Sequence, residues 1–298
     1  MVRQPLAVSL FPIMEDESPG AGGDQLWDCA HEKRLIVHAD DFGLCASVNR
    51  ATIAALESEA ISSASVMAPC DYFEAAAHYA ACNREMDIGL HLTVTSEWPV
   101  SRWGPVADRE KVPSLIDEDG CFYADADVVS GRAQPEEVYI ELKAQISRAL
   151  AAGVKPTHVD THMFALFYND MLYSVYRQVA KECGIAFLAP RGPSFSKRTA
   201  LKEEMLVRAL LTARPEIPVA EWTAAYVRSV RALRAEVTQI NVHLGFDDTE
   251  LRGMTGGDTP WGAQWRQRDM AAVESEEFRR EVRRDGVVLT RWRDLARA

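Results

Sequence analysis

The chain has 298 residues, long enough for one large domain or two small ones, and 47% of them are hydrophobic and 26% charged. This composition is typical of a globular protein and does not favour disorder or a coiled coil. The net charge of -11 argues against a nucleic acid or an anionic membrane as the main partner.

The cellular location follows from what the sequence lacks. Its six cysteines are scattered without a CxxC pair, and its first residues make a poor secretory signal. No apolar run approaches the length of about 20 residues that a membrane-spanning helix needs. We therefore expect a cytoplasmic protein with reduced thiols and no membrane partner.

The predicted elements alternate between strands and helices from residue 34 onward. Residues 1–33 lack periodicity and contain the run SPGAGGD, so we interpret them as an N-terminal extension. Predicted strands cover 34–39, 62–69, 87–94, 156–160, 185–190, 236–244 and 286–292. Predicted helices cover 47–58, 71–83, 135–153, 169–184, about 199–213, 221–235 and 262–284. This order predicts a parallel α/β fold, and both a closed barrel and an open doubly wound sheet fit it.

One stretch breaks the alternation. Residues 95–132 are too many for an ordinary connection and too aromatic for a linker, which favours a lid or substrate loop. Trp98 and Trp103 in this loop are candidates to stack on a sugar ring. The alternative is a hydrophobic clasp that holds the loop down, and the sequence leaves both open.

Histidines and aspartates gather where the predicted strands end. Parallel α/β folds place their chemistry at these carboxyl ends. The residues concerned are His38, Asp40, Asp41, His91, His158, Asp160, His162 and His243. A single histidine is more often a structural residue, but several that converge with carboxylates favour a metal site.

The sequence spacing of His158 and His162 indicates that the two histidines have different positions in the site. On a continuous strand, His158 and His162 would lie about 13 Å apart at roughly 3.3 Å per residue. They cannot bind one ion in that conformation, because metal ligands must gather within about 4 Å of one another. We expect the strand to end near Asp160, with His162 at the mouth of the site and His158 deeper.

Four motifs carry a resemblance to a known family. They are VHADDFG (37–43), GLHLT (89–93), THVDTH (157–162) and NVHLGFDD (241–248), and their order and spacing resemble those of the YdjC-like carbohydrate deacetylases, also called the ChbG/HpnK family. The resemblance runs from Leu35 to the end of the chain. It implies one domain over 34–298, built as a distorted TIM-like (β/α) barrel with about seven parallel strands.

The resemblance also implies the reaction and its residues. One divalent ion, magnesium or zinc, would be bound by Asp41, His91 and His162, with Asp40 as the general base and His243 as the candidate general acid. The family removes acetyl groups from N-acetylated sugars. A bound metal lowers the pKa of water to about 7 to 9, and Asp40 would take the proton of this water as it attacks the amide.

Other positions are less closely tied to the motifs. His158 or Asp160 would orient a ligand or the base. Arg191 follows the fifth predicted strand and would hold a sugar hydroxyl or a carboxylate, unless it is a solvated loop arginine. The family often has a further histidine where this chain has Phe164 and a proline where it has Leu244. The run WRQRD (265–269) is expected to be an amphipathic, solvated helix face.

Three functions remain open at this point. The first is an N-deacetylase whose partner is an acetylated sugar or a related small molecule. The second is a metal-dependent amidohydrolase that acts on a non-sugar amide. The third is a carbohydrate-binding relative without catalytic activity. The sequence also leaves open whether the chain forms a homodimer.

Overall fold

A parallel sheet forms the centre of the molecule. The computed structural model describes residues 33–189, 209–233, 237–256 and 258–295. Residues 1–32 of the predicted N-terminal extension and Arg191 therefore lie outside the described residues, and Lys33 begins the first strand of the sheet. Its strands are β1 (Lys33–Phe42), β2 (Ser63–Val66), β3 (Ile88–Leu92), β4 (His158–Thr161), β5 (Ala186–Phe187), β6 (Ala209–Thr212), β7 (Val237–His243) and β8 (Val287–Leu289). The order is β5-β4-β3-β2-β1-β7-β6, and β8 pairs with the start of β1. The predicted α/β barrel-like architecture is confirmed.

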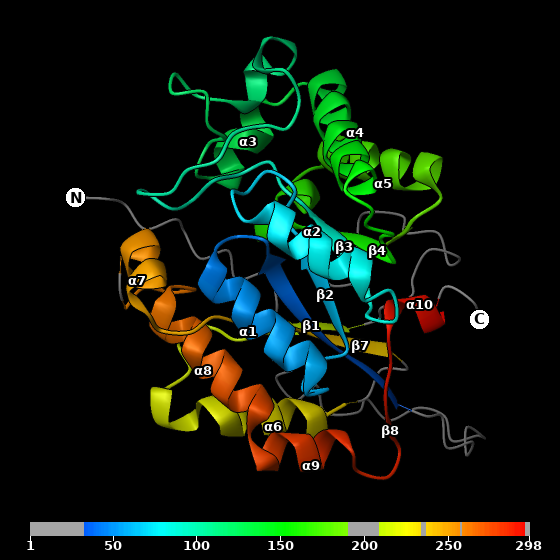
Figure 1. Cartoon of the computed structure of the whole chain (residues 1–298), viewed down its shortest axis with the longest axis vertical. Helices are drawn as coiled ribbons and strands as arrows, with labels where there is room; N and C mark the ends of the chain where they lie inside the picture. The colour runs from blue at the N-terminus through cyan, green and yellow to red at the C-terminus, as the bar shows by residue number, and fades with distance from the viewer. Residues whose placement is uncertain (1–32, 190–208, 234–236, 257, 296–298) are drawn as a thin grey trace, which may run out of the picture.

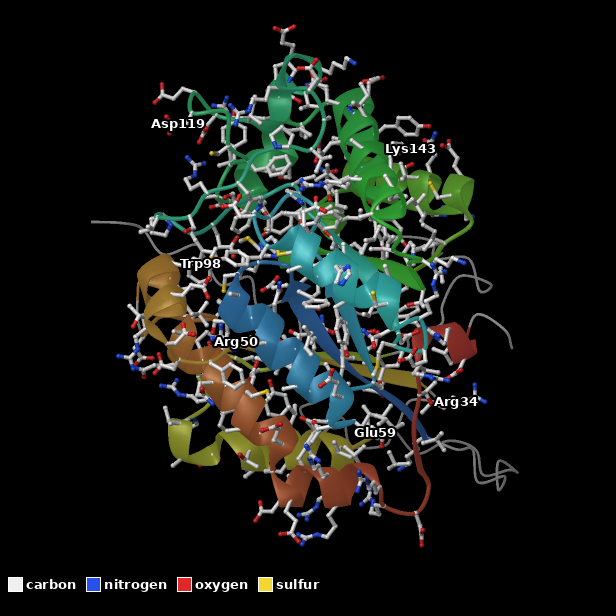
Figure 2. The ribbon with its side chains drawn as sticks, viewed as in Figure 1. Arg34, Arg50, Glu59, Trp98, Asp119 and Lys143 are labelled. Carbon is white, nitrogen blue, oxygen red and sulfur yellow. The ribbon has the colours of Figure 1, made fainter. Side chains whose placement is uncertain are left out.

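Helices surround the sheet, as expected for parallel strands joined by crossover connections. They are α1 (Ala46–Glu57), α2 (Phe73–Cys82), α3 (Ala126–Arg132), α4 (Pro135–Ala151), α5 (Asp170–Cys183), α6 (Trp222–Arg231), α7 (Thr249–Thr255), α8 (Ala263–Glu274), α9 (Glu276–Val282) and α10 (Trp292–Leu295). Figure 1 shows α1 and α2 in front of the sheet and α8 alongside α1. Charged side chains such as Glu59 and Lys143 extend outward from this shell (Figure 2). Among the described residues, no helix is long and apolar enough to cross a membrane.

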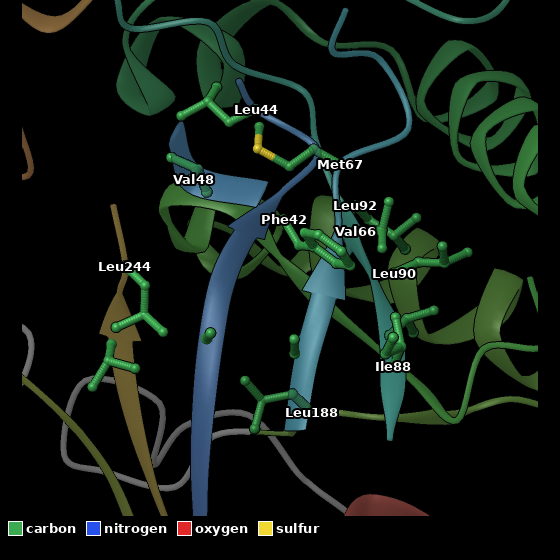
Figure 3. Packing of buried hydrophobic residues seen from close by; sticks show 14 of the residues in the cluster. Phe42, Leu44, Val48, Val66, Met67, Ile88, Leu90, Leu92, Leu188 and Leu244 are labelled. Atoms are coloured by element: carbon green, nitrogen blue, oxygen red, sulfur yellow. The ribbon is translucent and has the colours of Figure 1, made fainter. Parts of the chain in front are cut away.

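The hydrophobic core fixes the strand ends that bear the polar motifs. In β1, Leu35 to Val37 form a short apolar run that is fully buried, as expected for a central strand covered on both faces. Figure 3 shows Phe42 and Met67 close to the ends of β1 and β2. Leu244, which stands where the family often has proline, is fully buried just beyond β7.

Three of the differences between the structure and the predicted elements bear on the fold. The described part of the helix predicted at 199–213 is strand β6, which pairs with β7 along its length. The long helix predicted at 262–284 is divided at Ser275, whose hydroxyl caps α9 by accepting a hydrogen bond from the backbone N–H of Phe278. The stretch 95–132 contains α3 and two short 3-10 helices, η1 (Arg109–Lys111) and η2 (Pro113–Leu115).

Two buried side chains of α4 hold the beginning of this stretch. Gln145 exchanges hydrogen bonds with the backbone of Thr93, at 3.0 and 2.6 Å. Glu141 accepts hydrogen bonds from the backbone N–H groups of Val106 and Ala107, at 3.0 and 2.9 Å. We call residues 93–107 the anchored segment. Burial raises the pKa of Glu141 to about 7, although the N–H donors around it favour the carboxylate.

The raised pKa of Glu141 predicts a pH-dependent loss of stability. The folded state holds this proton more tightly than the unfolded state, whose pKa is near 4.5. Below pH 4.5 Glu141 is protonated in both states and does not destabilise the fold. As the pH rises to 7, the unfolded state loses this proton first, so the free energy of unfolding falls by about 3 kcal/mol. Glu141→Gln carries no titrating group at this position. Urea unfolding from pH 4.5 to 8 should show the wild type losing stability relative to this variant, and parallel curves would contradict the assignment.

Candidate metal centre

The two adjacent aspartates of β1 reach the same site because the backbone turns at Asp41. Neighbouring residues on a regular strand point to opposite faces. Asp41 instead has a φ of 66°, in the left-handed region, and the pairing of β1 with β2 shifts register between Ala39 and Phe42. Non-glycine residues in this region are uncommon and concentrate at functional sites. The turn brings the carboxylates of both Asp40 and Asp41 to His91.

Asp41, His91 and His162 form a compact group of potential metal ligands. Asp41 Oδ1 lies 3.4 Å from His91 Nε2 and 3.1 Å from His162 Nδ1. All three residues are buried, and Asp41 Oδ1 accepts no hydrogen bond from the described residues. Ligands that share an ion at about 2.0 to 2.2 Å are separated by about 3 to 3.5 Å. The donor set and its spacing therefore fit a divalent metal.

His162 enters this group because β4 ends directly before it. The strand closes at Thr161, and Met163 and Phe164 have φ values of 50° and 52°. These two left-handed residues turn the chain away from the sheet. The strand thus ends one residue beyond Asp160, close to where the spacing of His158 and His162 predicts it.

Carboxylates hold the outer nitrogens of the two histidines. His91 Nδ1 donates a hydrogen bond of 2.7 Å to Asp160 Oδ1, and His162 Nε2 donates one of 2.8 Å to Glu97 Oε2. Burial lowers the pKa of both imidazoles, but the facing carboxylates raise it more. The pKa of His162 is raised to about 9, and that of His91 lies well above its ordinary value. Such an excess of negative charge suits a cation.

Arg266 holds the other oxygen of Asp41. Its Nη2 lies 2.7 Å from Asp41 Oδ2, and its Nε donates to the carbonyl of Trp261. Burial raises the pKa of Asp41, but the Arg266 guanidinium and the neighbouring imidazoles keep it well below the usual range. Gly245 makes room for this side chain, since an added Cβ there would lie 3.0 Å from Arg266 Cβ.

The solvated helix face predicted for residues 265–269 is wrong. Arg266 and Asp269 are both buried, one turn apart on the inner face of α8. Asp269 accepts hydrogen bonds from Trp222 Nε1, Tyr226 Oη and the backbone N–H of His243. The charged side chains of Arg266 and Asp269 on this helix face therefore point toward the candidate metal centre and not toward solvent.

Asp40 and His243 lie beside the metal-ligand group. Asp40 Oδ2 accepts a hydrogen bond of 2.9 Å from Asn241 Nδ2 and lies 3.7 Å from His243 Nε2. Asp40 Oδ1 is buried and accepts no hydrogen bond from the described residues, with His38 Nε2 at 3.3 Å. Burial raises the pKa of Asp40 to about 6 and lowers that of His243 to about 3. The His243 imidazole is therefore neutral at pH 7.

A second group, His38, His158 and Asp160, lies deeper. Asp160 Oδ2 is 2.9 Å from His38 Nε2 and accepts a hydrogen bond of 2.9 Å from Ser65 Oγ. His158 is fully buried, stacks on Trp292 and lies 4.0 Å from the same oxygen. Asp160 thus connects His38 with His91. These direct contacts indicate a hydrogen-bonded support beneath the first group.

The two tryptophans of the anchored segment are buried. Trp98 is 7% exposed and Trp103 is 6% exposed. Trp103 donates from Nε1 to the carbonyl of Thr95, and its ring lies 5.9 Å from that of His162. This burial favours the clasp over the stacking platform.

Comparison with known proteins places the chain in a family. The family model described as YdjC-like protein matches residues 34–284, and the chain belongs to this family. A carbohydrate deacetylase of Enterococcus faecalis is 29% identical over 269 residues, which cover 89% of this chain and 98% of that protein. Carbohydrate deacetylase 2 of Listeria innocua is 26% identical, with coverages of 88% and 98%.

One solved structure is similar over nearly the whole fold. It comes from Enterococcus faecalis V583 and is provisionally described as a cellobiose-phosphate cleavage protein. Its TM-score is 0.74 at 27% identity, with coverage of 89% of this chain and 99% of that chain. The family that the four motifs predict is thus confirmed by both sequence and structure comparisons.

The ion pair between Arg266 and Asp41 predicts a large effect of one substitution. Arg266→Met leaves the buried Asp41 carboxylate without its cation, so the free energy of unfolding without metal should fall by about 3 to 5 kcal/mol. Urea unfolding of the metal-free proteins measures the change. Arg268→Met, on the same helix but paired at the surface with Asp258, should cost less than about 1 kcal/mol. Equal losses in the two variants would contradict a special role of Arg266.

Proposed function

We propose that the chain is a metal-dependent hydrolase that removes an N-acetyl group from a saccharide or a glycosylated metabolite. The observation that carries this proposal is the convergence of Asp41 Oδ1, His91 Nε2 and His162 Nδ1 at the carboxyl ends of parallel strands. The relatives named carbohydrate deacetylase support the substrate class. A cytoplasmic location belongs to the same proposal.

The three converging residues would hold one divalent ion, magnesium or zinc. When bound, this ion supplies Lewis-acid polarisation of the amide carbonyl and a lowered pKa of water. With the ion bound, Asp160 and Glu97 would keep the outer imidazole nitrogens protonated, so that the inner nitrogens give their lone pairs to the ion. Arg266 orients Asp41 by occupying its outer oxygen.

Asp40 is the proposed general base. Asn241 fixes Asp40 Oδ2, which leaves Oδ1 to accept the proton of the attacking water. A pKa of about 6 keeps this carboxylate largely ionised at neutral pH and still basic enough to accept a proton. His38 Nε2 lies 3.3 Å from Asp40 Oδ1 on the side of the deeper group and helps to position the carboxylate.

His243 is the proposed general acid, with a proton that arrives during the reaction. Its low pKa leaves the resting imidazole neutral. Nε2 lies 3.7 Å from Asp40 Oδ2, beyond hydrogen-bond distance, so the proton that His243 gives to the departing amine nitrogen would come from solvent rather than directly from Asp40. The bond from the His243 backbone N–H to Asp269 holds the residue in place for this transfer.

Acetate release tests the activity. Purified protein is incubated with a panel of N-acetylated sugars in the presence of magnesium or zinc, and Asp40→Asn is expected to lower kcat by about 10² to 10⁴-fold. Asp119→Asn serves as the control, because this carboxylate is 75% exposed on the long stretch before α4. Turnover of formyl or ureido compounds alone would favour the non-sugar amidohydrolase. Sugar binding without any turnover would favour the non-catalytic relative.

Metal analysis tests the ligand set separately. The double variant His91→Ala/His162→Ala should lose stoichiometric metal after dialysis against zinc, because only Asp41 remains of the three donors. His78→Ala, an exposed histidine of α2, should retain the wild-type metal content. Stoichiometric metal in the double variant would overturn the assignment.

A further inference from the structure

Glu97 of the anchored segment makes direct contact with a proposed metal ligand. Its Oε2 lies 2.8 Å from Nε2 of His162, whose other ring nitrogen, Nδ1, faces Asp41. The Glu97 side chain is 21% exposed, whereas that of His162 is 5% exposed. The contact therefore joins a residue at the edge of the site to a buried residue inside it.

The chemistry of the pair defines what Glu97 does. With an ion bound, the imidazole of His162 is neutral and has one N–H, and a carboxylate only accepts hydrogen bonds. Glu97 would then keep that proton on Nε2 and leave the lone pair of Nδ1 for the ion. Asp160 does the same for His91 with the nitrogens exchanged, since it binds Nδ1 and leaves Nε2 free.

The two supporting carboxylates differ in origin. Asp160 lies on β4 directly opposite His91 of β3, so the sheet register alone places it. Glu97 lies outside any strand, and its position depends on how the anchored segment is seated. Ser96 donates its backbone N–H to the carbonyl of Tyr123, and Trp103 binds both Ser96 and Thr95.

We propose that Glu97 is a positioning residue for His162, and that seating of the anchored segment thereby sets the affinity of the centre for its metal. The inference rests on the proposed metal site and deepens it. Partners that orient a ligating histidine change metal affinity by 10- to 100-fold when removed. Figure 1 shows the stretch between β3 and α4, with α3, beyond the end of the sheet.

Zinc affinity provides the first test, measured by competition with a chelator. Glu97→Ala should weaken binding by about 10- to 100-fold. Glu97→Gln should recover most of the loss, because its amide oxygen still accepts the bond from His162 Nε2. Glu110→Ala removes an exposed carboxylate of η1 just beyond the segment and should stay within twofold of the wild type. Urea midpoints of the metal-free variants check that the fold is retained.

A double-mutant cycle provides the second test. Trp103→Phe removes the Nε1–H that binds Thr95 and should loosen the segment. If the segment acts through Glu97, this substitution weakens zinc binding in the wild type and has no further effect in Glu97→Ala. Additive losses would contradict the coupling.

The outcomes separate this inference from the proposed function. A wild-type protein that binds no zinc overturns the metal site itself. If the wild type binds zinc and Glu97→Ala binds within threefold of it, the positioning role is wrong. Equal losses in Glu97→Ala and Glu97→Gln would show that charge rather than the hydrogen bond matters. Complete loss of binding in Glu97→Ala would make Glu97 a ligand, which also contradicts the inference.

Discussion

The carboxylate of Asp41 is the group on which the arrangement of the centre depends. One oxygen faces two imidazoles and the other is held by Arg266, so the carboxylate has a single orientation. The ion pair spans 225 positions of the chain and ties α8 to the end of β1. Because desolvation offsets much of the attraction in a buried pair, we expect its main effect to be to orient Asp41 rather than to add net stability to the fold.

Much of the centre could be predicted from the sequence because parallel strands bring their carboxyl ends together. Asp40, Asp41 and His91 follow or end apolar runs, and the structure places them side by side. His162 was predictable for a different reason. The motif resemblance implied His162 as a ligand, and its spacing from His158 indicated that the two do not share an ion on a continuous strand. The structure places His158 in the deeper group instead.

The residues that sequence reasoning missed act through distant partners. Arg266 lies in a helix whose polar residues resemble a solvated face, and only its contact with Asp41 explains its burial. Glu97 sits five residues beyond β3 in a stretch without periodicity, so no local pattern identifies its partner. The run from Ala209 to Thr212 suits a helix or a strand equally, and pairing with β7 decides between them.

The centre thus combines a part that the sheet fixes with a part that a loop supplies. His91 and Asp160 are directly opposite on neighbouring strands, so the barrel-like fold alone sets their geometry. His162 lies past the end of its strand and receives its carboxylate from residues anchored by Glu141 and Gln145 of α4. The segment that borders the site therefore also contacts a proposed metal ligand. Under the proposals above, a change in that segment that accommodates a different substrate would alter the centre as well, without any change in the sheet.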